Sequence, residues 1–265
     1  MKINILTYCT GYSYEIYERF VGSVYDTGFS GIVYMIVSPP DVPHMKQLRL
    51  LYPNLFFFVD SSTPTIHLNC HRFFIYQEIY KTVAFDADLI FLCDSRDVLF
   101  QKNLEEYPFD ESIDLFVFQE GVLIKNEPLF NVPWLEALEY YINEPILSKI
   151  QDQYVICCGT TLGKVNAIQL YIQHMCTILE DYQISFNLDQ GIHNYLLYEN
   201  KLGLRIQFMS NADHVVNTVA CDAHLVNDQD QIITSDGVVS YVVHQYDRFS
   251  KELKTRISKK YNFMI

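Results

Sequence analysis

Apolar residues follow two alternating patterns along the first hundred positions of the chain. Short runs rich in β-branched and aromatic residues, typical of buried strands, cover residues 3–8, 31–37, 54–60 and 88–94. Between them, apolar side chains spaced three and four residues apart predict helices over residues 14–28, 42–52 and 67–83. Strands that alternate with helices at this spacing indicate βαβ units, and therefore an α/β fold with a mostly parallel sheet and helices on both faces.

Beyond residue 100 the pattern loosens but continues. Further strands are predicted over residues 114–120, 153–163, 203–209 and 237–247. Helices are predicted around residues 134–142 and over 164–182 and 188–200. Because no repeat, low-complexity tract or linker divides the chain, we expect a single domain over residues 1–265. It would consist of a first half over 1–100, a second half over 101–250 and a basic tail over 251–265.

Two carboxylates interrupt one of the apolar runs. Asp94 falls where the run 88–94 ends, Arg96 and Asp97 follow, and the next residues are apolar again. An unpaired charge in a dry interior costs several kcal/mol, so such groups are usually paired, bound to a metal or placed at an opening. In an open parallel sheet, ligands bind beyond the carboxyl ends of the strands, and Asp94 is predicted to lie at that edge.

A divalent cation is one explanation for this pair. Two acidic groups held this close raise each other's pKa unless a cation compensates, and oxygen ligands of this kind suit Mg²⁺ or Mn²⁺. The other explanation is a structural network in which Arg96 or a helix terminus neutralises both aspartates. The spacing alone leaves both explanations open.

Charge and composition narrow the class of partner. The net charge of −13 is spread along the chain, which argues against a nucleic-acid partner, and an anionic small substrate would need a local cation. The seven cysteines form no CxxC pair and are predicted to be buried free thiols. We see no signal peptide and no transmembrane segment, so we expect a cytoplasmic protein. The composition of the basic tail predicts a solvated helix, and the alternative is weak contact with an anionic membrane.

The strand, the acidic pair and the apolar residues after it resemble the metal-binding segment of glycosyltransferases with the GT-A fold. Those enzymes carry a D-x-D motif at the end of a strand, where it binds a divalent cation that bridges the diphosphate of a nucleotide sugar. This chain has D-S-R-D instead. The resemblance implies that Asp97 stands for the last aspartate of the motif, that Asp94 replaces the first, and that Ser95 lies beside the cofactor.

Two earlier segments resemble this family in their order along the chain. Residues 6–37 resemble the opening βαβ unit that receives the nucleotide, which implies contacts from Thr7 and Tyr8 to the base or ribose. Residues 70–80 resemble the helix that places a cation near the phosphates, and Arg72 fits that role because a planar guanidinium suits phosphate oxygens.

Three later segments continue the resemblance. Gly159 and Thr160 lie in a segment that resembles the lining of the acceptor and donor-sugar pocket. Asp189 and Gln190 open a helix similar to the D-Q-x-x-x-N start of several such families, which implies that Asp189 orients the sugar or accepts the acceptor's proton. His244 ends the last apolar run, where a third metal ligand is expected. Each residue also has an ordinary structural explanation, such as an N-cap or a packed imidazole, and the order of the segments carries the resemblance.

The resemblance therefore implies a Rossmann-like GT-A fold and a glycosyltransferase of the hexosyltransferase type that depends on Mn²⁺ or Mg²⁺. The first half would bind a UDP- or GDP-sugar, and the second half the donor sugar and the acceptor hydroxyl of a glycan, protein or small molecule. Two alternatives stay open: a nucleotidyltransferase that makes the nucleotide sugar, and a non-catalytic nucleotide- or sugar-binding module of the same fold. The nucleotidyltransferase ranks lower because the residues after the first strand lack its glycine-rich signature.

Overall fold

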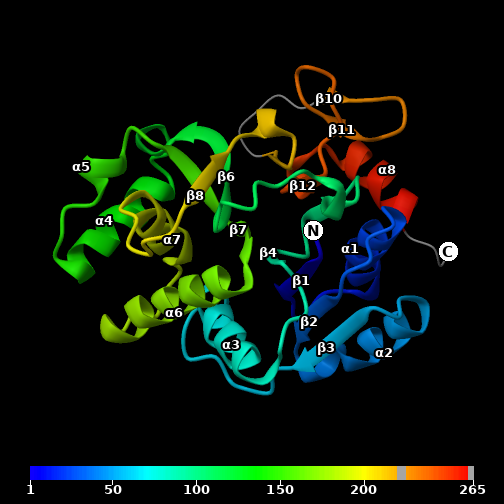
Figure 1. Cartoon of the computed structure of the whole chain (residues 1–265), viewed down its shortest axis with the longest axis horizontal. Coiled ribbons are helices and arrows are strands. Elements are labelled where there is room, and N and C mark those ends of the chain that lie inside the picture. The colour runs from blue at the N-terminus through cyan, green and yellow to red at the C-terminus, as the bar shows by residue number, and fades with distance from the viewer. Residues whose placement is uncertain (220–224, 262–265) are drawn as a thin grey trace.

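The computed structural model describes residues 1–219 and 225–261, and its centre is a seven-stranded sheet (Figure 1). In spatial order the strands are β3 (Leu55–Val59), β2 (Val33–Val37), β1 (Ile3–Tyr8), β4 (Leu89–Cys93), β7 (Tyr154–Lys164), β6 (Leu115–Leu123) and β8 (Ile206–Met209). All neighbouring pairs are parallel except those that β7 makes with β4 and β6. The predicted α/β class with a mostly parallel sheet is thus confirmed. The reversed direction of β7 was not predicted, because an apolar run has the same pattern in either direction.

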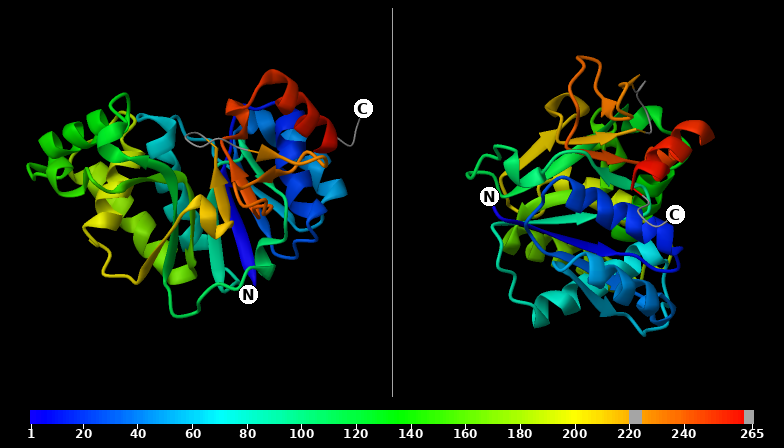
Figure 2. Two further views of the ribbon diagram at one scale, coloured as in Figure 1. Left: turned by 90° about the horizontal axis from the view of Figure 1, so that it is seen from above. Right: turned by 90° about the vertical axis from the view of Figure 1, so that its right-hand side faces the viewer.

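The inner strands β1, β2 and β4 are buried on both sides because helices cover both faces of the sheet. The helices are α1 (Tyr14–Asp26), α2 (Val42–Leu51), α3 (Leu68–Thr82), α4 (Asn131–Ile142), α5 (Leu147–Ile150), α6 (Val165–Asp181), α7 (Asp189–Tyr198) and α8 (Lys251–Tyr261). One hydrophobic core joins the sheet to α3, α4, α6 and α7, and a second joins its other face to α1 and α2. Along β4, Leu89 and Phe91 enter the second core, whereas Ile90 and Leu92 enter the first. Figure 2 shows the green and yellow helices gathered on one side of the sheet and the blue and red helices on the other.

A second, three-stranded sheet lies beside the first and was only partly predicted. Its strands are β5 (Val98–Phe100), β12 (Val242–His244) and β9 (Val216–Thr218). The run predicted as a strand over 237–247 shrinks to β12, which ends because Gln245 adopts a left-handed backbone conformation at φ 63°. A separate hairpin of β10 (Leu225–Val226) and β11 (Ile232–Ile233) completes the strands of the described residues.

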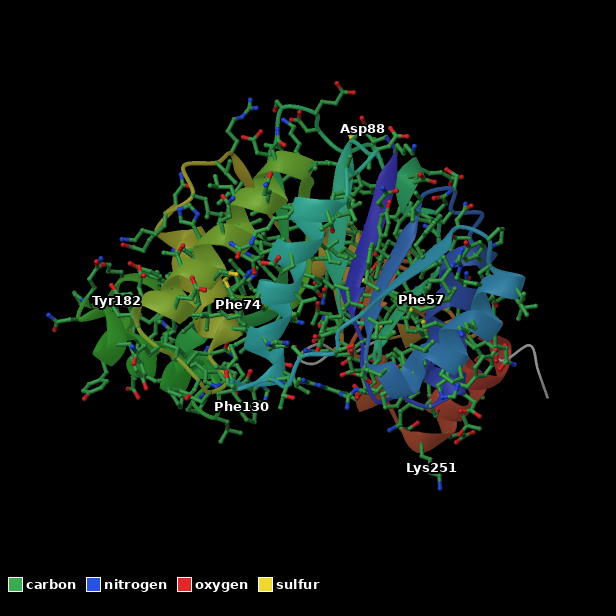
Figure 3. All side chains as sticks on the ribbon, turned by 90° about the horizontal axis from the view of Figure 1, so that it is seen from below. Phe57, Phe74, Asp88, Phe130, Tyr182 and Lys251 are labelled. Carbon is green, nitrogen blue, oxygen red and sulfur yellow. The ribbon has the colours of Figure 1, made fainter. Side chains whose placement is uncertain are left out.

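The amino and carboxyl ends of the parallel strands face opposite ends of the molecule. Figure 3 places Asp88, which precedes β4, at one end, and Phe130 and Lys251 at the other. The carboxyl ends of β1 and β4 therefore point toward the end marked by Phe130 and Lys251. A cavity of about 770 Å³ opens at the amino ends of the strands. Its lining includes Asp88 and Lys164, but neither Asp94 nor Asp97.

Two further predictions concern cysteines and membrane spans. The six cysteines within the described ranges are buried and free, as predicted, and Cys221 lies outside those ranges. Over the same ranges, no helix has both the length and the apolar character needed to cross a bilayer. The predicted tail helix corresponds to α8, and residues 262–265 of that tail are not described.

Candidate functional site

The end of β4 brings Asp94 and Asp97 to the carboxyl edge of the sheet. The backbone N–H of Asp94 donates to the carbonyl of Gly159 at 2.8 Å, which extends the pairing of β4 with β7 by one residue. The chain then turns through Ser95 and Arg96 and enters β5 at Val98. This turn explains the interrupted apolar run, because the polar residues lie where one buried strand ends and another begins.

His244 reaches the same place through the second sheet. β12 pairs antiparallel with β5 so that His244 lies opposite Val98. Its Nε2 is 3.7 Å from Asp94 Oδ2 and 3.9 Å from Asp97 Oδ1, while its Nδ1 is 3.4 Å from Cys157 Sγ. One potential ligand atom from each of Asp94, Asp97 and His244 lies within 4.8 Å of the other two. The structure thus brings together the three residues that were expected to bind a metal.

Gly159 leaves room for this cluster. A Cβ at this position would lie 2.6 Å from Asp94 Oδ2, 2.7 Å from His244 Cε1 and 2.9 Å from His244 Nε2. Any side chain here would collide with two of the three potential ligands. Two carboxylates and an imidazole around a space that only glycine leaves open fit a divalent cation such as Mn²⁺ or Mg²⁺.

The pKa values of the three groups reflect their mutual charge. Burial acts to raise the pKa of Asp94, but the charges of Arg72 and His244 outweigh it and hold the value at about 2. Burial raises the pKa of Asp97, with Asp94 adding to the effect and His244 opposing it. Burial acts to lower the pKa of His244, yet Asp94 and Asp97 raise it above the ordinary value. An excess of negative charge therefore favours a positive group at this site.

Arg72, rather than Arg96, is the side chain that neutralises Asp94. Its Nη1 donates to Asp94 Oδ1 at 2.6 Å and its Nη2 donates to Asp189 Oδ2 at 2.8 Å. Arg72 comes from the first half of α3 and Asp189 is the first residue of α7, so the guanidinium joins two helices to the end of β4. The structural network considered from the sequence is thus present at Asp94, but with a different arginine.

A pocket of about 390 Å³ opens beside Asp94 and Asp97. The residues that line it are Tyr8, Thr10, Tyr12, Leu68, Asn69, Arg72, Asp94, Ser95, Arg96 and Asp97. Tyr8, at the end of β1, donates its hydroxyl to Asp60 Oδ2 at 2.9 Å. The end of β1, the start of α3 and the turn after β4 therefore share one polar opening at the carboxyl edge.

The remaining expected site residues do not line this pocket within the described ranges. Thr7 and Thr160 are fully buried in the central sheet. Gln190 donates to Asn131 Oδ1 at 2.9 Å and to Glu120 Oε1 at 3.4 Å, on the side of the sheet that α4 and α7 cover.

Glu120 was not predicted as a site residue, although the sequence contained a signal for it. It is a buried carboxylate in the apolar strand β6, the same signal that drew attention to Asp94. Its charge raises the pKa of His244, though less than those of the two aspartates, which places it near the acidic cluster. Asn69 was also missed, because a helix position carries no periodic signal for a pocket lining.

Comparison with known proteins gives matches in structure only. No protein-family model and no curated protein sequence matches the chain. The galactosyltransferase LgtC, in complex with donor and acceptor sugar analogues, matches with a TM-score of 0.61 and 12% identity, over 99% of this chain and 97% of that chain. The glycosyltransferase GlyE of Streptococcus pneumoniae TIGR4 matches with a TM-score of 0.56 and 12% identity, over 100% of this chain and 61% of that chain.

A nucleotidyltransferase also matches. The inositol-1-phosphate CTP transferase of T. maritima gives a TM-score of 0.52 and 9% identity, over 99% of this chain and 97% of that chain. At these identities the likeness establishes the fold and leaves the activity to the site residues. The chain has a GT-A-like, Rossmann-type α/β fold.

Proposed function

We propose that this protein is a glycosyltransferase that moves a sugar from a UDP- or GDP-sugar to an acceptor hydroxyl with the help of Mn²⁺ or Mg²⁺. The observation that carries the proposal is the cluster of Asp94, Asp97 and His244, whose potential ligand atoms lie within 4.8 Å of one another beside a polar pocket. The cluster lies at the carboxyl edge of the sheet, where ligands of open α/β folds bind. The fold similarity to two glycosyltransferases supports this reading.

Each site residue has a proposed role. Asp94, Asp97 and His244 would hold the cation, which when bound supplies positive charge against the negative charge that develops on the leaving diphosphate. Tyr8 lines the pocket with its hydroxyl fixed by Asp60, so it would contact the nucleoside. Ser95 lines the same pocket.

Asp189 would orient the transferred sugar. Its carboxylate is buried and accepts a charged hydrogen bond from Arg72 at 2.8 Å. Because Arg72 already occupies Oδ2 of this carboxylate, a hydrogen-bonding role toward the sugar fits this geometry better than removal of the acceptor's proton. Arg72 would then act as a positioning residue for both Asp94 and Asp189.

The experiment that tests the proposal measures which product forms from which substrate. The purified chain is incubated with UDP- and GDP-sugars and Mn²⁺, and release of the nucleoside diphosphate is followed for the wild type and for Asp97→Asn. We expect release by the wild type, with or without an added acceptor, and loss of release in Asp97→Asn and in EDTA. Release that persists in both cases would contradict the metal-dependent mechanism, and no release from any donor would favour a non-catalytic binding module.

A nucleotidyltransferase is the second candidate, because the T. maritima CTP transferase shares the fold. The two reactions give different products from different substrates. A nucleotidyltransferase forms pyrophosphate from a nucleoside triphosphate and a phosphorylated substrate, whereas a glycosyltransferase forms a nucleoside diphosphate. Pyrophosphate formation from CTP or UTP with a sugar phosphate would therefore replace our proposal with this one.

A further inference from the structure

We propose that Arg96 binds the diphosphate of the nucleotide donor. This inference rests on the proposed function and adds a residue that the D-x-D resemblance does not supply. Two cationic side chains line the pocket beside Asp94 and Asp97, namely Arg72 and Arg96. A diphosphate in this pocket needs positive charge in addition to a metal ion, because Asp94 and Asp97 are themselves acidic.

Arg72 is not available to a ligand in this arrangement. Both of its terminal nitrogens are engaged, with Asp94 at 2.6 Å and with Asp189 at 2.8 Å. The residue is 8% exposed. Moving it toward a phosphate would leave two carboxylates without their partner, which is costly in a buried site.

Arg96 has the opposite properties. Its side chain is 54% exposed, and its Nη2 is 2.9 Å from Asp247 Oδ2 and 3.9 Å from Asp97 Oδ2. An exposed ion pair of this kind contributes little stability, about 0–1 kcal/mol, so an incoming anion can compete with Asp247 for the guanidinium. Five N–H donors in a planar fork suit the oxygens of a diphosphate.

The backbone of Arg96 is held firmly while its side chain is free to exchange partners. The hydroxyl of Tyr246 donates to the carbonyl of Arg96 at 2.9 Å, and the backbone N–H of Tyr246 lies 3.4 Å from the carbonyl of Asp97. Tyr246, two residues beyond the end of β12, thus holds the turn after β4 in place. A fixed backbone with an exposed guanidinium is a suitable arrangement for a side chain that closes over a ligand.

The unusual spacing of the acidic pair follows from this role. Two residues separate Asp94 from Asp97, and they differ in exposure: Ser95 is 4% exposed, whereas Arg96 is exposed. A D-x-D turn would have one intervening residue. The longer turn therefore places Arg96 between the two aspartates in the chain and leaves both aspartates beside His244.

The test compares binding of a nucleoside diphosphate with binding of its nucleoside. Isothermal titration calorimetry with Mn²⁺ is run on the wild type, Arg96→Ala, Arg96→Lys and the matched control Asp247→Asn, using UDP with uridine and GDP with guanosine. Loss of a hydrogen bond to a charged group predicts a roughly 10- to 100-fold weaker affinity of Arg96→Ala for the diphosphate. Its affinity for the nucleoside should equal that of the wild type, and Arg96→Lys should be intermediate.

The control separates phosphate binding from a purely structural latch between Arg96 and Asp247. If Arg96 binds the diphosphate, Asp247→Asn frees the guanidinium and keeps or improves the diphosphate affinity. If the ion pair only stabilises the turn, Arg96→Ala and Asp247→Asn weaken diphosphate and nucleoside alike, and the inference is wrong. If the wild type and Arg96→Ala bind the diphosphate equally well, the proposed role of Arg96 is wrong, while the proposed function stands. A wild type that binds neither UDP nor GDP overturns the proposed function and this inference together.

Discussion

The replacement of Gly159 by alanine tests the geometry of the acidic cluster most sharply. The added Cβ would lie 2.6 Å from Asp94 Oδ2, whereas ordinary contact begins at 3.4 Å, so the carboxylate or the backbone must move by about 0.8 Å. His244 is crowded as well, at 2.7 Å and 2.9 Å from the new atom. Metal–ligand distances tolerate deviations of only about 0.2 Å, so both ligands would leave their binding positions.

Two quantities change in different ways under this replacement. Overpacking of a buried site costs typically about 1–3 kcal/mol in the free energy of unfolding, which urea denaturation measures. Disturbed support of metal ligands lowers affinity about 10- to 100-fold, which calorimetric titration with Mn²⁺ measures. We expect Gly159→Ala to remain folded and to lose Mn²⁺ affinity by at least about tenfold.

Gly163 provides the matched control on the same strand. A Cβ there would lie 2.7 Å from Leu115 Cδ1 and 2.9 Å from the carbonyl oxygen of Asp114, away from the cluster. Gly163→Ala should therefore lose stability by a similar amount and keep the wild-type affinity for Mn²⁺. Unchanged Mn²⁺ affinity in Gly159→Ala, or an equal loss in both variants, would refute the reasoning.

Three further predictions concern the buried charges and the sheet. Arg72→Met leaves Asp94 and Asp189 without their cation and should cost about 3–5 kcal/mol in the free energy of unfolding at neutral pH, as measured by urea denaturation. The part of this loss that comes from Asp94 should shrink as the pH falls toward about 2, where the wild-type carboxylate takes up its proton, and an equal loss at neutral pH and near pH 2 would contradict the reasoning. Burial acts to lower the pKa of His244, but its acidic neighbours raise it above 6.5, so the imidazolium persists above that pH. The attraction between this imidazolium and the two aspartates stabilises the metal-free fold, and this stabilisation is lost as the pH rises through the folded pKa of His244. Since a metal must displace that proton, Mn²⁺ affinity should increase with pH above 6.5, and a flat calorimetric profile would exclude His244 as a ligand. Gly31→Ala places a Cβ against a carbonyl oxygen of β1 and should lower the melting temperature strongly, whereas an unchanged melting temperature would show that β1 and β2 tolerate separation.

The position of Asp94 could be predicted because it depends on local rules. A buried strand ends where its apolar run ends, and the carboxyl ends of parallel strands share an edge. These rules suffice to place Asp94 at the opening, and the structure has it one residue beyond β4. The helices and strands from β1 to β4 follow from the same periodicity.

The meeting of Asp97 with His244 depends on a pairing that the apolar pattern does not contain. β5 and β12 are three-residue strands far apart in the chain, and runs this short carry little periodic signal. The family resemblance suggested His244 through the order of segments, while the register of β12 on β5 shows how it arrives there. Long-range pairing of short strands is set by the whole sheet rather than by the strand itself.

The pairing of Arg72 with Asp94 and Asp189 also could not be predicted from the sequence. A guanidinium on one helix was expected to face phosphates, but in the structure it joins the end of β4 to the start of α7. Such a pairing depends on the packing of α3 beside both elements, which no local pattern specifies. The buried Glu120 could have been recognised, because it interrupts an apolar strand as Asp94 does.

Nucleotide binding with and without metal tests the central claim most directly. The melting temperature of the wild type and of Asp97→Asn is measured with UDP, GDP, CDP and dTDP, each in Mn²⁺ or in EDTA. A ligand at a hundredfold excess over its dissociation constant stabilises by about 2.7 kcal/mol, which corresponds to a rise of about 5–10 °C for a chain of this size. We predict this rise for UDP or GDP in Mn²⁺ only, and its absence in Asp97→Asn. No rise with any nucleotide, or an equal rise in EDTA and in Asp97→Asn, would contradict a metal-dependent nucleotide-sugar site.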